Sequence, residues 1–306
     1  MSILLVGAGG QVGQELRKTL GALVPAVGPI TAIARQQLDL SDLAAIATTV
    51  NAAQPKLIVN AAAYTAVDKA ESEPELAYRI NAEAPQILAE SAAKCGAKLV
   101  HISTDYVFAG EAGSPRCESD PTGPLNVYGE SKLAGEIAIR EALDEHIILR
   151  TAWIYGTHGK GNFLKTMLRL GKEREVLTVV ADQVGSPTWA RDIAEVISQL
   201  SGRLMTQHSD QTAAVAGTYH FTNSGVASWY DFAIAIFQEA KALGIPLTVH
   251  TVNPIATADY PTPAKRPLYS VLNCQKLSQC LRGPAPHWRE SLQKMLKEFV
   301  HSDFVG

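Results

Sequence analysis

The sequence lacks several features that mark secreted or membrane proteins. It has only four cysteines in 306 residues, and none of them forms a CxxC pair or a zinc-type spacing. We therefore expect reduced thiols and a cytoplasmic location. No apolar run approaches the roughly 20 residues that cross a bilayer. We interpret the first residues as a strand that leads into a glycine, not as a signal peptide. The four cysteines are Cys95, Cys117, Cys274 and Cys280.

An excess of one charge is also missing. The chain has 27 Lys and Arg against 30 Asp and Glu, a net charge of -3, and no basic block. This balance argues against nucleic acid as a partner. None of the eight histidines falls in an HExxH or comparable ligand spacing, so we assign no metal site from the sequence. The length fits one large or two moderate domains.

The first half of the chain alternates short apolar runs with helical segments. This alternation is typical of a parallel sheet wrapped by crossover helices, so we predict an α/β fold with a Rossmann-type doubly wound sheet. The predicted strands are 2–6, 29–34, 57–60, 98–103 and 146–150, and the predicted helices are 11–20, 43–51, 83–94 and 128–142.

After residue 150 the alternation becomes irregular. We predict a dinucleotide-binding domain over residues 1–150 and a smaller C-terminal α/β substrate lobe over 151–306, with segments near 188–222 returning to the first domain. The polar stretch 201–217 is expected to be a surface excursion, and the long loop 109–126 to border the active site. The other predicted elements are helices 162–170, 191–200, 229–242 and 288–300, and strands 177–181 and 217–222.

A glycine-rich loop follows the first predicted strand and opens the first helix. Gly7, Gly10 and Gly13 have a GxxGxxG spacing. Glycine permits a tight turn and close approach of backbone N–H groups to a pyrophosphate, and the helix N-terminus adds partial positive charge. We predict that these glycines, with Gln11 and Val12, bind a dinucleotide.

Residues beyond the loop bear on the choice of cofactor. Folds that prefer the unphosphorylated dinucleotide carry an acid about 20 residues after the glycines, at the end of the second strand. Here that place holds Arg35, a cation that could pair with a 2′-phosphate, which favours NADPH and leaves NADH open. The further predicted cofactor contacts are Asp39 and Leu40 near the adenine, and Ala62, Ala63 and Tyr64 near the ribose.

Tyr128 and Lys132 stand four residues apart on a predicted helix. That spacing puts the phenol and the ammonium on one face. A free tyrosine has a pKa of about 10 and is a poor acid at neutral pH, and a nearby cation lowers that value. We therefore predict that Lys132 lowers the pKa of Tyr128 and that Tyr128 is a general acid or base.

Four motifs in this order resemble the extended short-chain dehydrogenase/reductase family of nucleotide-sugar enzymes. They are the glycine loop, Asn60-Ala-Ala-Ala63, Ser103-Thr104 and the Tyr128-x-x-x-Lys132 pair. Longer similar segments run over nearly the whole chain, among them 60–71, 101–110, 128–136, 149–156, 182–188 and 266–270.

The resemblance implies an activity and roles for single residues. The activity is reduction of dTDP-4-dehydro-6-deoxy-L-mannose at its C4 ketone to dTDP-L-rhamnose, with Tyr128 as proton donor. Lys132 would also bind the nicotinamide ribose, and Thr104 would donate a hydrogen bond to the same sugar oxygen. Asp105 and Trp153 take the positions of sugar contacts.

Related 4,6-dehydratases carry an Asp-Glu pair after the threonine, and the pair Asp105-Tyr106 here argues against elimination. Two alternatives stay open beside the reductase. A regulatory subunit of the same fold would bind another enzyme without catalysis, and an epimerase would recycle a tightly held cofactor. The resemblance also implies a homodimer and leaves Mg²⁺ possible. No matching acidic cluster is evident in the sequence, and Glu15 and Glu290 are candidate ligands that we interpret as exposed helix acids.

Overall fold

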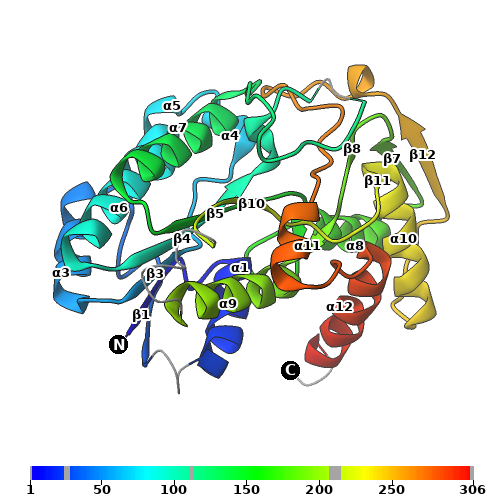
Figure 1. The fold of residues 1–306 in the computed structure, drawn as a ribbon. Coiled ribbons are helices and arrows are strands. Elements are labelled where there is room, and N and C mark those ends of the chain that lie inside the picture. The colour runs from blue at the N-terminus through cyan, green and yellow to red at the C-terminus, as the bar shows by residue number, and fades with distance from the viewer. Residues whose placement is uncertain (1, 24–27, 111–112, 207–214, 304–306) are drawn as a thin grey trace.

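A six-stranded parallel sheet forms the centre of the molecule (Figure 1). The computed structural model describes residues 2–23, 28–110, 113–206 and 215–303. The strand order is β10-β5-β4-β3-β1-β2, so the order reverses between β1 and β3 and opens a crevice at their carboxyl ends. The predicted fold class is confirmed. The strands are β1 (Ile3–Val6), β2 (Ile30–Ile33), β3 (Leu57–Asn60), β4 (Lys98–Thr104), β5 (His146–Thr151) and β10 (Gly217–His220).

Helices cover both faces of this sheet. Helices α1 (Gln11–Thr19) and α9 (Ala190–Thr206) pack together on one face. The other face carries α3 (Leu43–Ala53), α6 (Ala84–Cys95) and α7 (Val127–Ala142). Because both faces are covered, strands such as β1 and β3 are apolar at nearly every position and fully buried.

A separate hydrophobic core lies beyond the sheet. It is built around Tyr155, Phe232 and Trp288, and it shares no residue with the two cores that flank the sheet. Helices α8 (Phe163–Glu173), α10 (Trp229–Ala242) and α12 (Trp288–Asp303) surround it, with strand β7 (Val176–Val180) paired to β12 (Thr251–Ile255). The domain boundary at residue 150 stays a prediction.

Short elements complete the chain. Strands β6 (Ile154–Tyr155) and β9 (Thr188–Trp189) pair in parallel, and β8 (Val184–Gly185) pairs antiparallel with β11 (Ala227–Ser228). Helix α11 (Gln275–Leu281) packs near β10. Among the described residues, no helix is both long and apolar enough to cross a membrane.

Most of the elements predicted from the sequence are present, and their ends differ by a few residues. The surface excursion predicted over 201–217 is wrong in its first part, because α9 continues to Thr206 and buries Leu204. Residues 207–214 lie outside the described part. The sequence analysis missed α4 (Val67–Ala70), α5 (Pro74–Tyr78), the π-helix η2 (Arg79–Glu83), α11, β6, β8, β9, β11 and β12, most of which are too short to show a period.

A buried ion pair fastens α7 to the sheet. Both carboxylate oxygens of Glu136 accept hydrogen bonds from Arg150 on β5, Nε at 2.9 Å and Nη2 at 2.6 Å. The hydroxyl of Ser103 on β4 donates a third bond at 2.6 Å. The Glu136 side chain has no exposure to solvent and that of Arg150 only 4%. Because the geometry is bidentate, the carboxylate stays ionised inside the protein.

Arg150→Met should lower the free energy of unfolding by about 3–5 kcal/mol, because it leaves a charged carboxylate buried without its partner. Arg140→Met is the matched control. Arg140 bonds the same Glu136 carboxylate at 3.2 Å, but its side chain is 37% exposed, so its loss should cost under about 1 kcal/mol. Urea unfolding at pH 7 measures both values. Equal losses would contradict the role of burial.

Candidate active site

The predicted catalytic residues gather at the carboxyl edge of the sheet. Thr104 is the last residue of β4, and the 3₁₀ turn η3 (Asp105–Val107) follows it. Tyr128 and Lys132 lie in the first turns of α7. Asn126 caps this helix, accepting a hydrogen bond from Gly129 N at 2.8 Å.

The Tyr128 phenol meets the Thr104 hydroxyl. Thr104 donates a hydrogen bond to Asp105 Oδ1 at 3.0 Å and accepts one from Tyr106 N at 3.2 Å. Burial raises the pKa of Tyr128 to about 12, with the Asp105 charge adding to the rise and the Thr104 hydrogen bond opposing it. The phenol therefore keeps its proton at neutral pH, which is the state that a proton donor needs.

The structure contradicts the prediction that Lys132 lowers the pKa of Tyr128. The pKa of Tyr128 is raised, whereas we expected Lys132 to lower it. Lys132 Nζ instead bonds His101 Nε2 at 3.0 Å and the Ile102 carbonyl at 2.8 Å, both on β4. The helical spacing does put both residues on one face of α7. The hydrogen bonds to His101 and Ile102 on β4 fix the position of the Lys132 ammonium group.

Asp105 has the environment of a binding carboxylate. Its side chain is buried, and burial raises its pKa to about 6 against the opposing effect of nearby hydroxyl groups. By hydrogen-bond geometry its Oδ2 has no partner among the described residues. A buried oxygen with free lone pairs is a strong acceptor for a sugar hydroxyl. The geometry fits the predicted role, which stays a prediction.

Trp153 lies in an unusual backbone conformation for a bulky residue, with φ of +48°. Its indole stacks on Trp229 with centroids 3.5 Å apart and planes 1° apart. A Cβ added at Gly185 would lie 2.5 Å from the indole, so only glycine fits there. The ring is thereby held as a rigid flat surface, as the predicted sugar contact requires.

The glycine loop forms a cradle against the turn after β3. Gly7 has φ of +84°, and a Cβ there would lie 2.6 Å from Ala62 N. A Cβ on Gly13 would collide with the Gly7 carbonyl, which explains the close approach of α1 to the loop. Gly10 is exposed, and a Cβ there would have only the Gly7 carbonyl as a neighbour, at 3.4 Å. This cradle fits a pyrophosphate at the N-terminus of α1.

The side chains of Gln11 and Val12 serve other contacts. Gln11 Oε1 accepts a hydrogen bond from Asn162 Nδ2 at 2.7 Å, which ties the loop to the start of α8. Val12 is part of the core between the sheet and α9. Because these side chains are engaged elsewhere, only the backbone N–H groups of Gln11 and Val12 could bind an anion.

The predicted adenine-side residues fall into two groups. Arg35 is exposed, with Nε 3.2 Å from Asp39 Oδ2 in an ion pair. The Ser41 backbone N–H and Arg35 both hold the pKa of Asp39 below its usual value. Leu40, in contrast, is buried in the core under α3. The structure therefore leaves the guanidinium accessible to a phosphate but commits the leucine to packing.

The turn after β3 carries the predicted ribose contacts. Ala62 and Ala63 are partly buried, and Ala62 N donates to Asn60 Oδ1 at 3.1 Å. The Tyr64 hydroxyl donates to Glu73 at 2.8 Å, and burial together with Glu73 raises the pKa of Tyr64 to about 12. Tyr64 thus points toward α5 with its hydroxyl already used.

The Mg²⁺ left open by the resemblance finds no support. No group of three or more His, Cys, Asp or Glu side chains that could hold a metal occurs in the described residues. Glu15 is buried and pairs with Arg191 Nε at 2.9 Å, so a guanidinium neutralises this carboxylate. Glu290 lies in the first turn of α12 and is exposed.

Sequence reasoning missed three buried polar residues beside the site. His101 on β4 contacts Lys132. Asn81 in η2 donates to the Ser131 hydroxyl at 3.0 Å, and Ser270 lies beside Asp105. A polar residue inside an otherwise apolar run was the available signal at position 101.

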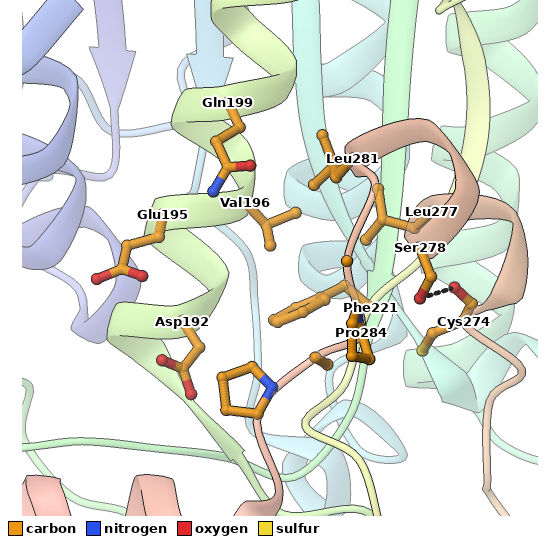
Figure 2. A pocket seen from close by; sticks show the side chains of 13 residues that line it. Asp192, Glu195, Val196, Gln199, Phe221, Cys274, Leu277, Ser278, Leu281 and Pro284 are labelled. Carbon is orange, nitrogen blue, oxygen red and sulfur yellow. Dashed lines mark hydrogen bonds between the residues drawn. The ribbon is translucent and has the colours of Figure 1, made fainter.

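A separate cavity of about 200 Å³ lies between α9 and α11 (Figure 2). Glu195 and Gln199 project from α9, while Phe221 and Leu277 supply apolar surface. None of the residues predicted as catalytic or binding lines this cavity.

The strand order and the crevice between β1 and β3 define an α/β protein with a Rossmann-type fold. A family model described as RmlD substrate binding domain matches residues 1–301. The dTDP-4-dehydrorhamnose reductase of Escherichia coli K12 is 46% identical over 303 residues, covering 97% of this chain and 98% of its own. The reductase of that name from Burkholderia thailandensis is 43% identical, covering 98% and 99%.

A solved structure agrees with these sequences. The dTDP-4-dehydrorhamnose reductase of Bacillus anthracis, described in complex with NADP, is 38% identical with a TM-score of 0.86, covering 97% of this chain and 99% of its own. The chain belongs to the dTDP-4-dehydrorhamnose reductase family of extended short-chain dehydrogenases/reductases.

Gly10→Ala should weaken NADPH binding at least about tenfold and leave the fold intact. Gly10 has φ of -77°, and the new methyl group would have only the Gly7 carbonyl, at 3.4 Å, as a neighbour. The methyl group can therefore disturb only a bound pyrophosphate. Fluorescence titration with NADPH and a melting curve measure the two effects. Gly21→Ala, where the new Cβ would have no neighbour within 4 Å, is the control and should change neither. Unchanged NADPH affinity in Gly10→Ala would show that the glycine cradle does not bind the cofactor.

Proposed function

We propose that the chain reduces dTDP-4-dehydro-6-deoxy-L-mannose to dTDP-L-rhamnose with NADPH. The observation that carries this proposal is the meeting of a protonated Tyr128 with Thr104 at the crevice of a nucleotide-binding sheet. Relatives named for this activity align over almost the full length of the chain. A regulatory subunit would have no use for the group of Thr104, Tyr128 and Lys132.

Each residue has a task that its surroundings support. When bound, NADPH supplies the hydride for C4. Tyr128 gives its proton to the oxygen at C4, and Thr104 stabilises the charge that develops there. In the structure the Thr104 proton points to Asp105, so the hydroxyl rotates to serve the sugar. Lys132 holds the ribose, Asp105 accepts a sugar hydroxyl, and Trp153 supplies an apolar wall.

The preference for NADPH rests on Arg35 and on the described complex of the Bacillus anthracis relative with NADP. Gly7, Gly10 and Gly13 surround the pyrophosphate, and Ala62 and Ala63 approach the ribose. A homodimeric state and a cytoplasmic location stay predictions from the sequence.

Tyr128→Phe should reduce turnover by at least about 100-fold, because the ring stays and only the transferable proton is lost. The assay incubates the protein with dTDP-4-dehydro-6-deoxy-L-mannose and NADPH and identifies the sugar product. NADPH affinity should be nearly unchanged. Tyr106→Phe is the matched control, since Tyr106 lies edge-on to Tyr128 with centroids 5.5 Å apart. Near-normal turnover in Tyr128→Phe would contradict the role of Tyr128 as the acid. If the unaltered protein forms no dTDP-L-rhamnose, the proposed function is wrong.

Arg35→Ala should raise the KM for NADPH about tenfold and leave the KM for NADH unchanged or lower. The loss of one exposed charge-assisted contact accounts for about 1.4 kcal/mol. The freed Asp39 carboxylate would also repel the 2′-phosphate. Steady-state kinetics with both cofactors measures the effect, and Arg35→Lys should keep most of the selectivity. An equal change for both cofactors would count against a phosphate contact.

A further inference from the structure

Helix α1 begins without a side-chain cap. Its N-cap residue is Gly10, which has no side chain to accept a hydrogen bond from the start of the helix. The first turn of any helix leaves backbone N–H groups without partners inside the helix. In α1 these groups belong to Gln11, Val12 and Gly13, and they open onto the predicted cofactor site. The loop that carries them must therefore be held in place by other contacts.

The side chain of Gln11 is held by a segment that lies far away in the sequence. Asn162 Nδ2 donates a hydrogen bond to Gln11 Oε1 at 2.7 Å, across 151 positions of the chain. The backbone of Gly159, with φ of +84°, lies against the methylene groups of Gln11. A Cβ added at Gly159 would lie only 2.6 Å from Gln11 Cγ. The amide and the stem of Gln11 are therefore both fixed by the segment 156–162.

Asn162 uses its whole amide group in this arrangement. Its Oδ1 accepts a hydrogen bond from Lys165 N at 2.9 Å and so caps α8. Because Oδ1 faces a backbone donor, Nδ2 is free to donate twice. One hydrogen bond goes to Gln11 Oε1, and the other goes to the Gly156 carbonyl at 2.8 Å. A single side chain thus joins the start of α8, the turn before it and the glycine loop.

Further contacts between this segment and its neighbours support the junction. His158 Nε2 lies 3.3 Å from Glu15 Oε1, one turn beyond Gln11 on α1. Lys165 Nζ donates to the Gly159 carbonyl at 3.1 Å, so α8 also holds the part of the segment that rests on Gln11. Helix α8 packs in the core beyond the sheet, whereas α1 packs against the sheet itself. The junction therefore connects two separate cores at the glycine loop.

We propose that Asn162 is a positioning residue for the dinucleotide, because it fixes Gln11 and with it the backbone N–H groups that open α1. The proposal deepens the proposed function and rests on it for the identity of the cofactor. A backbone N–H group binds a phosphate oxygen only from a fixed position, so a loosened loop binds the diphosphate more weakly. Because NADPH and NADH share this diphosphate, losing the junction affects both cofactors equally.

Asn162→Ser tests this role. Serine is also a good N-cap residue, so α8 keeps its cap, but the shorter side chain no longer reaches Gln11 or Gly156. The dissociation constants of NADPH and NADH, measured by fluorescence titration, should each rise about tenfold. The kcat at saturating NADPH should stay within about twofold, because the residues that act on the sugar are unchanged.

Thr166→Ala is the matched control for this variant. The Thr166 hydroxyl bonds the backbone carbonyl of Asn162 at 3.0 Å and leaves its amide group untouched, so neither cofactor should bind differently. Unchanged affinities in Asn162→Ser, or a loss for NADPH alone, would overturn the proposal.

A double-mutant cycle separates positioning from a general loss of stability. Gln11→Met keeps a stem against Gly159 and removes the acceptor for Asn162, so it should weaken NADPH as much as Asn162→Ser does. The double variant should bind NADPH no more weakly than either single variant, because both changes remove the same contact. Losses that add in the double variant would overturn the proposal.

These titrations need no sugar nucleotide, so they can fail independently of the proposed reaction. If Asn162→Ser weakens both cofactors but the unaltered protein forms no dTDP-L-rhamnose, the positioning role stands and the reductase activity is wrong. If the unaltered protein forms the product and Asn162→Ser binds both cofactors normally, the activity stands and the positioning role is wrong.

Discussion

The parallel register of β3 against β4 is the constraint on which the site depends. Asn60 pairs with His101 in that register, and Val6 of β1 pairs with Asn60 on its other side. Because neighbouring strands run in one direction, the glycine cradle, the turn after β3 and the Thr104 turn all open onto one crevice. A slip of one residue would turn Asn60 and His101 to opposite faces of the sheet.

The same helix carries two kinds of buried charge. Glu136 has a bidentate partner in Arg150 and stays ionised, so it joins α7 to the sheet. Lys132, one turn earlier, has neutral partners, and burial therefore moves its pKa to about 8. Asp105 follows the same rule in the opposite direction, with its pKa raised to about 6. Complete pairing supports the fold, and incomplete pairing leaves groups that titrate near neutrality.

The core around Tyr155, Phe232 and Trp288 supports an aromatic surface near the Thr104 turn. It holds Trp229, on which Trp153 stacks, and so braces an aromatic surface beside the crevice. Asn126 Nδ2 donates to the Lys265 carbonyl at 2.7 Å, which ties the start of α7 to a late segment of the chain. The family relatives align over the sheet and over this further core, so the likeness is not limited to the sheet.

Periodicity and spacing were enough to predict the parallel sheet, its main helices and the places of the glycine loop, Thr104 and Tyr128, because these depend on local patterns. The partners of Lys132 could not be predicted, since they come from β4, 30 and 31 residues away in sequence. The same holds for Leu40, which the sequence placed near a cofactor and the fold buried in a core. A sequence determines which side chains can share a face. Only the tertiary structure decides which neighbour a long or polar side chain contacts. A buried polar group needs a hydrogen-bond partner, and the fold determines which partners lie within reach.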